Sequence, residues 1–254
     1  MKRYVFITIP GSNLETLYAG FNCPNRGYIV LPFPWEKGIK EISDKKEYYK
    51  KRIINELQDT KESICFIVYG RILEWWSVSI PNLLREICHD CTVFAYFGDL
   101  IEKHQLDINR IKKECDYVCT FDLGDANKYD LFFCQEPYSG YDLESCENQY
   151  DVCFVGRAKD RLDKILNTYS FLSNQGFVCE FYIAEALIYN RLLITDCRID
   201  KFENIPNIVY FDEPESINLK RITKWSNADN KKWIDYFSIE TMIRRLEDIE
   251  QQKK

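Results

Sequence analysis

Short apolar runs rich in β-branched and aromatic residues alternate with helical stretches along the first half of the chain. The clearest run, Ile64–Gly70 (ICFIVYG), has the length and continuous hydrophobicity of a strand buried on both faces. This alternation requires right-handed crossovers, which produce a mostly parallel sheet covered by helices on both sides. The first half is expected to contain strands at Tyr4–Ile9, Gly27–Phe33, Ile64–Gly70, Thr92–Asp99, Asp116–Asp122 and Leu131–Tyr138.

The same pattern predicts helices and a second domain. Helices are expected between the strands at Asp44–Gln58, Ile80–Ile87 and Ile108–Glu114. The polar segment Ser139–Gln149 reads as a linker between domains. After it the alternation restarts, with a helix at Arg161–Asn174 and strands at Asp151–Val155, Gly176–Ile183, Arg191–Thr195 and Asn207–Asp212. The sequence therefore predicts an α/β protein of two Rossmann-like domains, residues 1–140 and 149–224, with a C-terminal helical segment at 225–254.

Charge and hydropathy exclude some classes of protein. With 254 residues the chain can bury a sizeable core. Its net charge of −6 argues against a nucleic-acid groove as the main function. No run approaches the roughly 20 apolar residues that a membrane span needs. We therefore expect a cytoplasmic protein.

A second feature follows the polar linker. The stretch Tyr150–Arg161 (YDVCFVGRAKDR) places Gly156 at the end of a buried strand, before the cations Arg157, Lys159 and Arg161. A glycine there lets the backbone approach a ligand, and the following helix start offers unpaired N–H groups. The pattern indicates an anion site with phosphate as the guest, although basic turns also occur as plain connections.

Two stretches resemble GT-B glycosyltransferases. FVGRAKDR followed by EALIYNRLLIT resembles their donor-binding half, where a Gly-basic turn meets the nucleotide diphosphate and a Glu-Ala-Leu helix presents its Glu to the ribose. CDYVCTFDLGDANKYDLFFCQEPYS (Cys115–Ser139) resembles a bacterial GT-B-like family of capsule, lipopolysaccharide and exopolysaccharide biosynthesis proteins, with D-V-x-T-F-D, D-A-x-K-Y and P-Y-S motifs. The resemblance covers most of Ile64–Tyr210. It implies an acceptor-side N-terminal domain and a C-terminal domain that binds a nucleotide-sugar donor.

The resemblance assigns donor-binding roles to five residues. Gly156 would allow the diphosphate to approach, and Arg157, with Lys159 or Arg161, would balance its charge and stabilise the departing nucleotide. Glu185 would accept hydrogen bonds from the ribose hydroxyls. Two readings without such a function stay open: Arg161 begins its helix, and Glu185 is a first-turn carboxylate that the helix dipole favours.

The chain departs from the family between Ile183 and Ala184. In the family a strand and a Gly-rich turn normally separate the elements that Tyr182–Glu185 here joins directly. Either the second domain is shortened, with a donor pocket that lacks one wall, or the native chain carries a further segment between Ile183 and Ala184. This departure opens the alternative of a non-catalytic member.

Asp99 is the best candidate for a catalytic base. An inverting transfer needs a carboxylate or histidine within reach of the acceptor hydroxyl, whereas a retaining transfer does not. Asp99 follows a buried strand at the carboxyl edge, where open α/β sheets keep their ligands; an N-cap or turn role is the alternative. Gly11 and Ser12 follow the first strand and are expected to line the cleft. His89 and His104 are expected on the surface.

The cysteines do not favour a metal site. They number eleven, and several lie inside apolar strands, where a thiol behaves as a small hydrophobe. Cys88-His-Asp-Cys91 has ligand spacing, but Cys115 and Cys119 do not form a second knuckle. The chain has no Asp-x-Asp pair, through which GT-A transferases hold a divalent cation. We expect no metal and no cofactor, with the nucleotide-sugar bound as a substrate.

Partners follow from the resemblance and from one basic helix. The acceptor is expected to be a glycan or a lipid-linked glycan. The Lys45–Arg52 stretch, with Tyr48 and Tyr49, offers contact with an anionic bilayer at the inner face of the membrane, and a solvated charged face is its alternative.

The sequence supports one leading function and two alternatives. The leading function is the metal-independent transfer of a sugar from a nucleotide-sugar to a surface-polysaccharide or lipopolysaccharide acceptor. The first alternative is a non-catalytic binding or assembly module of the same pathway. A Rossmann-type epimerase is disfavoured, because the glycine fingerprint and a Tyr-x-x-x-Lys pair are missing.

Overall fold

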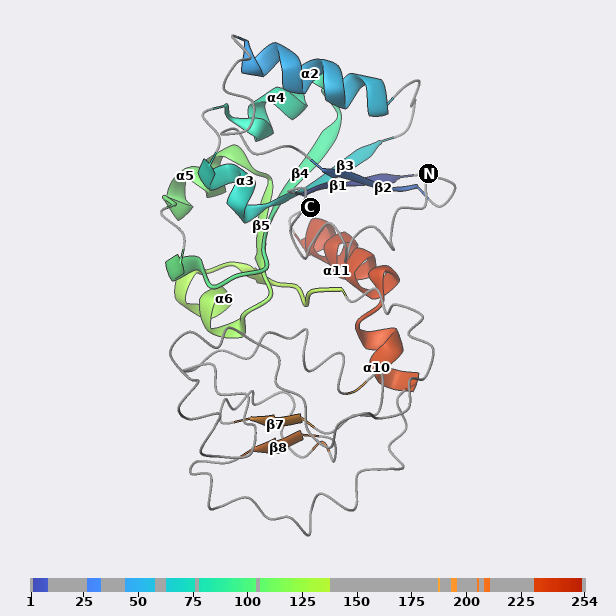
Figure 1. Ribbon diagram of the computed structural model, residues 1–254, viewed down its shortest axis with the longest axis vertical. Coiled ribbons are helices and arrows are strands. Elements are labelled where there is room, and N and C mark those ends of the chain that lie inside the picture. Colours follow the sequence, from blue (N-terminus) through green and yellow to red (C-terminus); the bar gives the residue numbers. More distant parts are fainter. Residues whose placement is uncertain are drawn as a thin grey trace, which may run out of the picture. The chain divides into compact units, whose positions relative to one another are not determined.

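The computed structural model describes two compact units of the chain (Figure 1). One unit consists of Met1–Ser139 together with Met242–Lys254, and the other of Gly140–Thr241. The described residues are 2–8, 27–32, 44–57, 63–75, 78–103, 106–137, 187, 193–195, 205, 208–210 and 231–252.

A six-stranded, all-parallel sheet forms the centre of the first unit. Its strands are β1 (Arg3–Thr8), β2 (Tyr28–Pro32), β3 (Ile64–Tyr69), β4 (Cys91–Phe97), β5 (Tyr117–Thr120) and β6 (Phe132–Phe133). The order is β2-β1-β3-β4-β5-β6, so the chain first adds β2 on one side of β1 and then continues on the other side. The predicted α/β class with a mostly parallel sheet is confirmed, and β1 and β3 flank the point where the winding reverses.

Helices connect the strands, and most begin where the sequence provides a cap. Asp44, Asp107 and Asp122 each accept a hydrogen bond from a backbone N–H in the first turn of the helix that follows. The helical elements of the first half are α2 (Lys45–Glu56), α3 (Gly70–Trp75), α4 (Ile80–Ile87), the 3₁₀ turn η3 (Ile101–Lys103), α5 (Ile108–Glu114) and α6 (Leu123–Tyr129). The predicted helices at 44–58, 80–87 and 108–114 are present, while α3 and α6 were not predicted because each is only about two turns long.

The C-terminal helix α11 (Ile239–Gln252) packs on the sheet of the first unit. Met242, Ile243, Leu246 and Ile249 recur at helical spacing and are buried. Each such side chain contributes about 1.5–3 kcal/mol as an upper estimate. Polar contacts fix the helix as well, because Tyr4 Oη donates to Glu247 and Lys2 forms an ion pair with Glu250. α11 lies within the segment 225–254 that was predicted to be helical, and from Met242 onward it belongs to the first unit.

The second unit contains a parallel pair of strands and the helix α10 (Lys231–Tyr236). β7 (Leu193–Thr195) pairs with β8 (Ile208–Tyr210), inside the two ranges predicted for strands. The other predicted elements of this half, at 151–155, 161–174 and 176–183, lie outside the described residues. A second Rossmann-like domain and the shortened junction at Ile183 therefore stay predictions.

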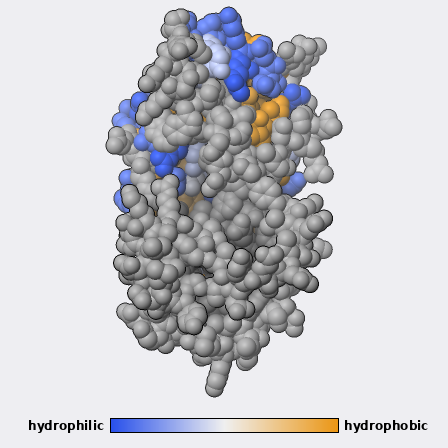
Figure 2. All heavy atoms as spheres, in the orientation of Figure 1, coloured by the Kyte–Doolittle hydropathy of each residue, from blue (hydrophilic) through white to orange (hydrophobic). Residues whose placement is uncertain are grey.

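Helix α2 carries the basic stretch. Figure 2 shows hydrophilic side chains gathered over the part of the molecule where α2 lies. Lys46 pairs with Glu86 of α4 at 2.6 Å, and Tyr49 is fully buried, so this ring does not reach the surface. Within the described ranges, every helix is too short or too polar to cross a membrane.

Candidate functional site at the carboxyl edge of the sheet

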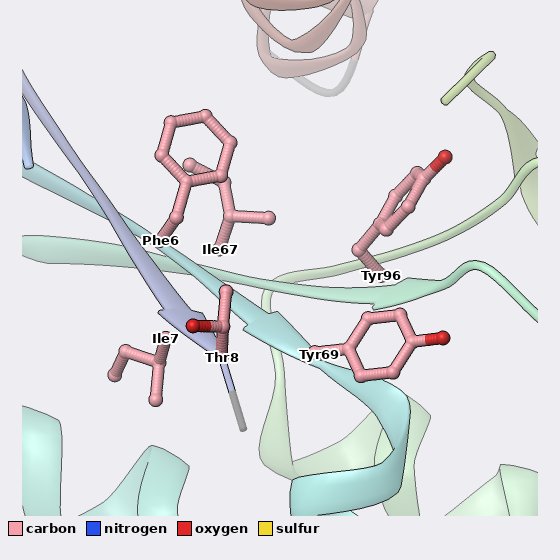
Figure 3. A pocket seen from close by; sticks show the side chains of 6 residues that line it. All are labelled: Phe6, Ile7, Thr8, Ile67, Tyr69 and Tyr96. Carbon is pink, nitrogen blue, oxygen red and sulfur yellow. The ribbon is translucent and has the colours of Figure 1, made fainter. Parts of the chain in front are cut away.

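A small hollow lies at the carboxyl ends of β1 and β3, where the winding of the sheet reverses (Figure 3). Open α/β sheets bind their ligands at this kind of position. Its cavity volume is about 10 Å³, which is room for about one water molecule. Its lining residues are Phe6, Ile7, Thr8, Ile67, Tyr69 and Tyr96.

Strand register explains how these side chains come together. Phe6 lies opposite Ile67 on the neighbouring strand, and Tyr69 lies opposite Tyr96. Ile67 and Tyr69 are two residues apart in β3 and therefore share one face of the sheet, so all four side chains lie on that face. Figure 3 shows Phe6, Ile67 and Tyr96 pointing to the side where the C-terminal helix lies, and Ile7 pointing to the other side. The wall of the hollow is therefore largely aromatic and apolar.

Three lining residues, Thr8, Tyr69 and Tyr96, carry hydroxyl groups that interrupt this apolar wall. Tyr96 Oη donates to the carbonyl oxygen of Cys134 at 3.3 Å. Thr8 is 1% exposed, and in the described part of the chain its Oγ1 has no hydrogen-bond partner. A buried hydroxyl without a hydrogen-bond partner costs free energy. A polar group of a ligand, or a water molecule, would therefore be stabilised here by a hydrogen bond to Thr8 Oγ1.

An ion pair lies on the neighbouring loops. Arg71, in the first turn of α3, donates from Nη2 to Oδ2 of Asp99 at 3.0 Å. Glu74 lies on the other side of the guanidinium, with 4.0 Å between its Oε2 and Nη1 of Arg71. The side chains of Arg71 and Asp99 are 27% and 30% exposed, so the pair is open to a ligand from solvent.

Close backbone packing brings these loops together. A Cβ built on Gly98 would lie 2.9 Å from Glu136 Oε1 and 3.0 Å from a ring carbon of Tyr69. A Cβ on Gly70 would lie 2.4 Å from the ring of Phe97. Both glycines therefore let the ends of β3 and β4 approach their neighbours more closely than any other residue would.

Two buried carboxylates at this edge were not singled out from the sequence. Glu136 is 4% exposed and follows β6, and Asp125 is 6% exposed in the first turn of α6. Burial raises the pKa of the Asp125 carboxyl, and a hydrogen bond from the backbone N–H of Ile101 partly offsets this. Both residues lie in the stretch 115–139, whose motifs resemble the GT-B-like family, and this was the feature of the sequence that could have identified them. Arg71 had a signal too, because Gly70-Arg71 shares the Gly-Arg order of Gly156-Arg157, for which a preceding strand was predicted.

Among the described cysteines of this unit, Cys65, Cys115, Cys119 and Cys134 are buried, whereas Cys88 and Cys91 are half-buried. Burial raises the pKa of Cys91 and of Cys115 to about 12, and it also raises the pKa of Cys65 and Cys119. Within the described residues no three His, Cys, Asp or Glu side chains are grouped so that they could hold a metal ion.

Of the residues predicted to form the site, the structure describes Asp99. It follows β4 at the carboxyl edge, as expected, and its role as a base stays a prediction. His89 is exposed in the turn after α4. The remaining predicted site residues, which lie outside the described residues, are Gly11, Ser12, Gly156, Arg157, Lys159, Arg161 and Glu185.

Comparison with known proteins does not assign the chain to a family. A scan against models of protein families finds no match, and a search of curated proteins finds no significant match.

Proposed function

We propose that the chain is a metal-independent glycosyltransferase that moves a sugar from a nucleotide-sugar donor to a surface-polysaccharide or lipopolysaccharide acceptor. The observation that carries the proposal is the position of Asp99. Its carboxylate lies at the carboxyl edge of a doubly wound parallel sheet, beside a hollow at the winding reversal and 3.0 Å from Arg71. The resemblance of residues 115–139 and of the Gly156 and Glu185 stretches to GT-B enzymes supplies the substrate class.

The roles of the residues follow from the charge that moves in such a transfer. The acceptor oxygen forms a bond to the anomeric carbon of the sugar, and the bond from that carbon to the phosphate oxygen breaks. Asp99 takes the proton of the acceptor hydroxyl if the transfer inverts the anomeric centre. Gly156 and Arg157, with Lys159 or Arg161, receive the negative charge of the departing nucleoside diphosphate, and Glu185 binds its ribose.

The carboxylates of the first unit suit a hydroxyl-rich acceptor. Asp99 and Glu74 lie on the guanidinium of Arg71, and the carboxylate of Glu136 lies against Gly98 at the end of β4. Ionised carboxylates accept hydrogen bonds from hydroxyls and repel phosphates. Arg71 occupies Oδ2 of Asp99, which leaves Oδ1 to receive the hydroxyl of the acceptor.

Thermal unfolding with added nucleotides tests the donor assignment. We expect a nucleoside diphosphate, either uridine or guanosine, to raise the melting temperature of the wild type, because it binds the folded state alone. Arg157→Ala should abolish this rise. Lys113→Ala removes an exposed cation of α5 and should leave the rise intact. The absence of a shift with every common nucleoside diphosphate would contradict the proposal.

A non-catalytic module is the second candidate. One observation favours it, the direct junction of Ile183 and Ala184. A module of this kind binds the nucleotide-sugar without releasing free nucleoside diphosphate. Measuring that release with the wild type separates the two, because only an enzyme releases the nucleoside diphosphate. An inverting enzyme should also lose this rate in Asp99→Asn.

A further inference from the structure

The carboxylate of Asp125 contacts a neighbouring loop although it belongs to the first turn of α6. Its Oδ2 accepts a hydrogen bond from the backbone N–H of Ile101 at 2.7 Å. Asp125 is 6% and Ile101 is 3% exposed, so water does not readily replace this contact. Ile101 stands two residues after Asp99, at the start of η3. The side chain of α6 thus holds the loop that carries the proposed base.

A series of hydrogen bonds fixes Asp125 to the end of β5. Asp122 N–H donates to Thr120 Oγ1 at 3.2 Å, and Asp125 N–H donates to Asp122 Oδ1 at 2.7 Å. Thr120 is fully buried and pairs with Phe97, the last residue of β4. Each bond restrains the next group, so the position of the Asp125 carboxylate is set by the sheet rather than by a flexible surface contact.

The loop between these fixed points is short. β4 ends at Phe97 and η3 begins at Ile101, so Gly98, Asp99 and Leu100 alone connect them. Gly98 is packed closely against Glu136 and Tyr69. With both ends held, the backbone of Asp99 has little freedom, and its side chain is directed to Arg71.

We propose that Asp125 is a positioning residue that sets the orientation of Asp99 toward Arg71. The stretch Asp125-Ala-Asn-Lys-Tyr129 contributed to the family resemblance, but the proposed chemistry gives its aspartate no role. Positioning of Asp99 would be that role. The contribution of Asp125 to catalysis rests on the proposed function. Its effect on the orientation of Asp99 is independent of that function.

NMR of the full-length chain tests this role with two signals, the ¹³C resonance of the Asp99 carboxyl and the exchange rate of the Ile101 amide. Asp125→Ala removes the acceptor, so the Ile101 amide should exchange at least roughly tenfold faster and the Asp99 resonance should shift. Asp125→Asn keeps an oxygen at the acceptor position and should return both signals toward the wild type. This pattern of loss and recovery would support positioning.

Two further variants keep the test decisive. Asp107→Ala removes another aspartate that accepts backbone hydrogen bonds, the N-cap of α5, and should leave the Asp99 resonance in place. Asp125→Glu retains the charge but moves the carboxylate by one methylene, so it should shift the Asp99 resonance even if Asp125→Ala does not fold.

The proposal is overturned if the Asp99 resonance stays at its wild-type position in the folded variants at 125. It is equally overturned if the Ile101 amide keeps its protection there, or if Asp107→Ala shifts the Asp99 resonance as much. Nucleotide binding is not read in this experiment. A failure here therefore leaves the proposed function standing, and a protein that binds no nucleotide leaves the positioning role standing.

Discussion

At the residue scale, the carboxyl edge depends on two positions where no side chain fits. Gly70 directly follows β3 and packs against the ring of Phe97, and Gly98 directly follows β4 and packs against Glu136 and Tyr69. The chain turns at these points directly into the segments that carry Arg71 and Asp99. The ion pair therefore results from close backbone packing as much as from the attraction of opposite charges.

Gly70→Ala should lower the free energy of unfolding by about 1–3 kcal/mol, because the new Cβ would lie 2.4 Å from the ring of Phe97. Urea denaturation measures the loss. Phe97→Leu removes most of the opposing ring, so the double variant should lose less than the sum of the two single variants. Strictly additive losses would show that the ring does not exclude the methyl group.

Thiol reactivity tests the burial of the cysteines. With the pKa of Cys91 and Cys115 raised from 9.0 to about 12, their thiolate fraction at pH 8 falls roughly a thousandfold below that of a free thiol. Iodoacetamide should leave both unmodified in the native protein at pH 8, and peptide mass spectrometry should find them alkylated after unfolding in urea. Rapid alkylation of either in the native state would contradict the assignment.

The same pKa values give a direction for stability at alkaline pH. The folded pKa exceeds the unfolded one, so the contribution of these thiols is fully present below about pH 9. It declines as the pH rises toward 12, because the unfolded state then loses its protons more readily than the folded state.

At the scale of elements, α11 is held to the sheet by its apolar face and by Tyr4. The Tyr4 phenol is 4% exposed and donates to Glu247; burial, together with this bond, raises its pKa. Tyr4→Phe should lower the free energy of unfolding by about 1.5–3 kcal/mol, the contribution of a hydrogen bond to a charged group. Urea denaturation measures this loss.

Tyr48→Phe is the matched control for that variant. The Tyr48 hydroxyl accepts a long hydrogen bond of 3.5 Å from Arg52 on the surface of α2, so its removal should change stability by less than about 0.5 kcal/mol. Equal effects of Tyr4→Phe and Tyr48→Phe would show that the bond to Glu247 does not anchor α11.

Elements with a strong period could be predicted from the sequence, and short ones could not. Ile64–Tyr69 is apolar throughout and was predicted as a buried strand. α6 contains Gly124, Asp125 and Asn127, which have low helix propensity, so its cap at Asp122 was its main signal. Asp99 could be placed because it directly follows a strand, whereas its pairing with Arg71 depends on the order of β3 and β4 in the sheet, which no local pattern encodes.

At the scale of the whole molecule, the chain divides into two units, and the proposed transfer of a sugar uses residues of both. Asp99 and Arg71 belong to the first, and the sequence range of Gly156, Arg157 and Glu185 belongs to the second. The proposal assigns the acceptor hydroxyl to the first unit and the nucleotide to the second. Nucleotide binding is therefore the property on which the whole account depends.

Calorimetric titration of the full-length chain with uridine and guanosine diphosphate, in the presence of EDTA, tests this claim most directly. The account predicts saturable binding of one of them without a divalent metal, and its loss in Arg157→Ala. Binding that requires a divalent metal, or no binding of either nucleotide, would contradict it.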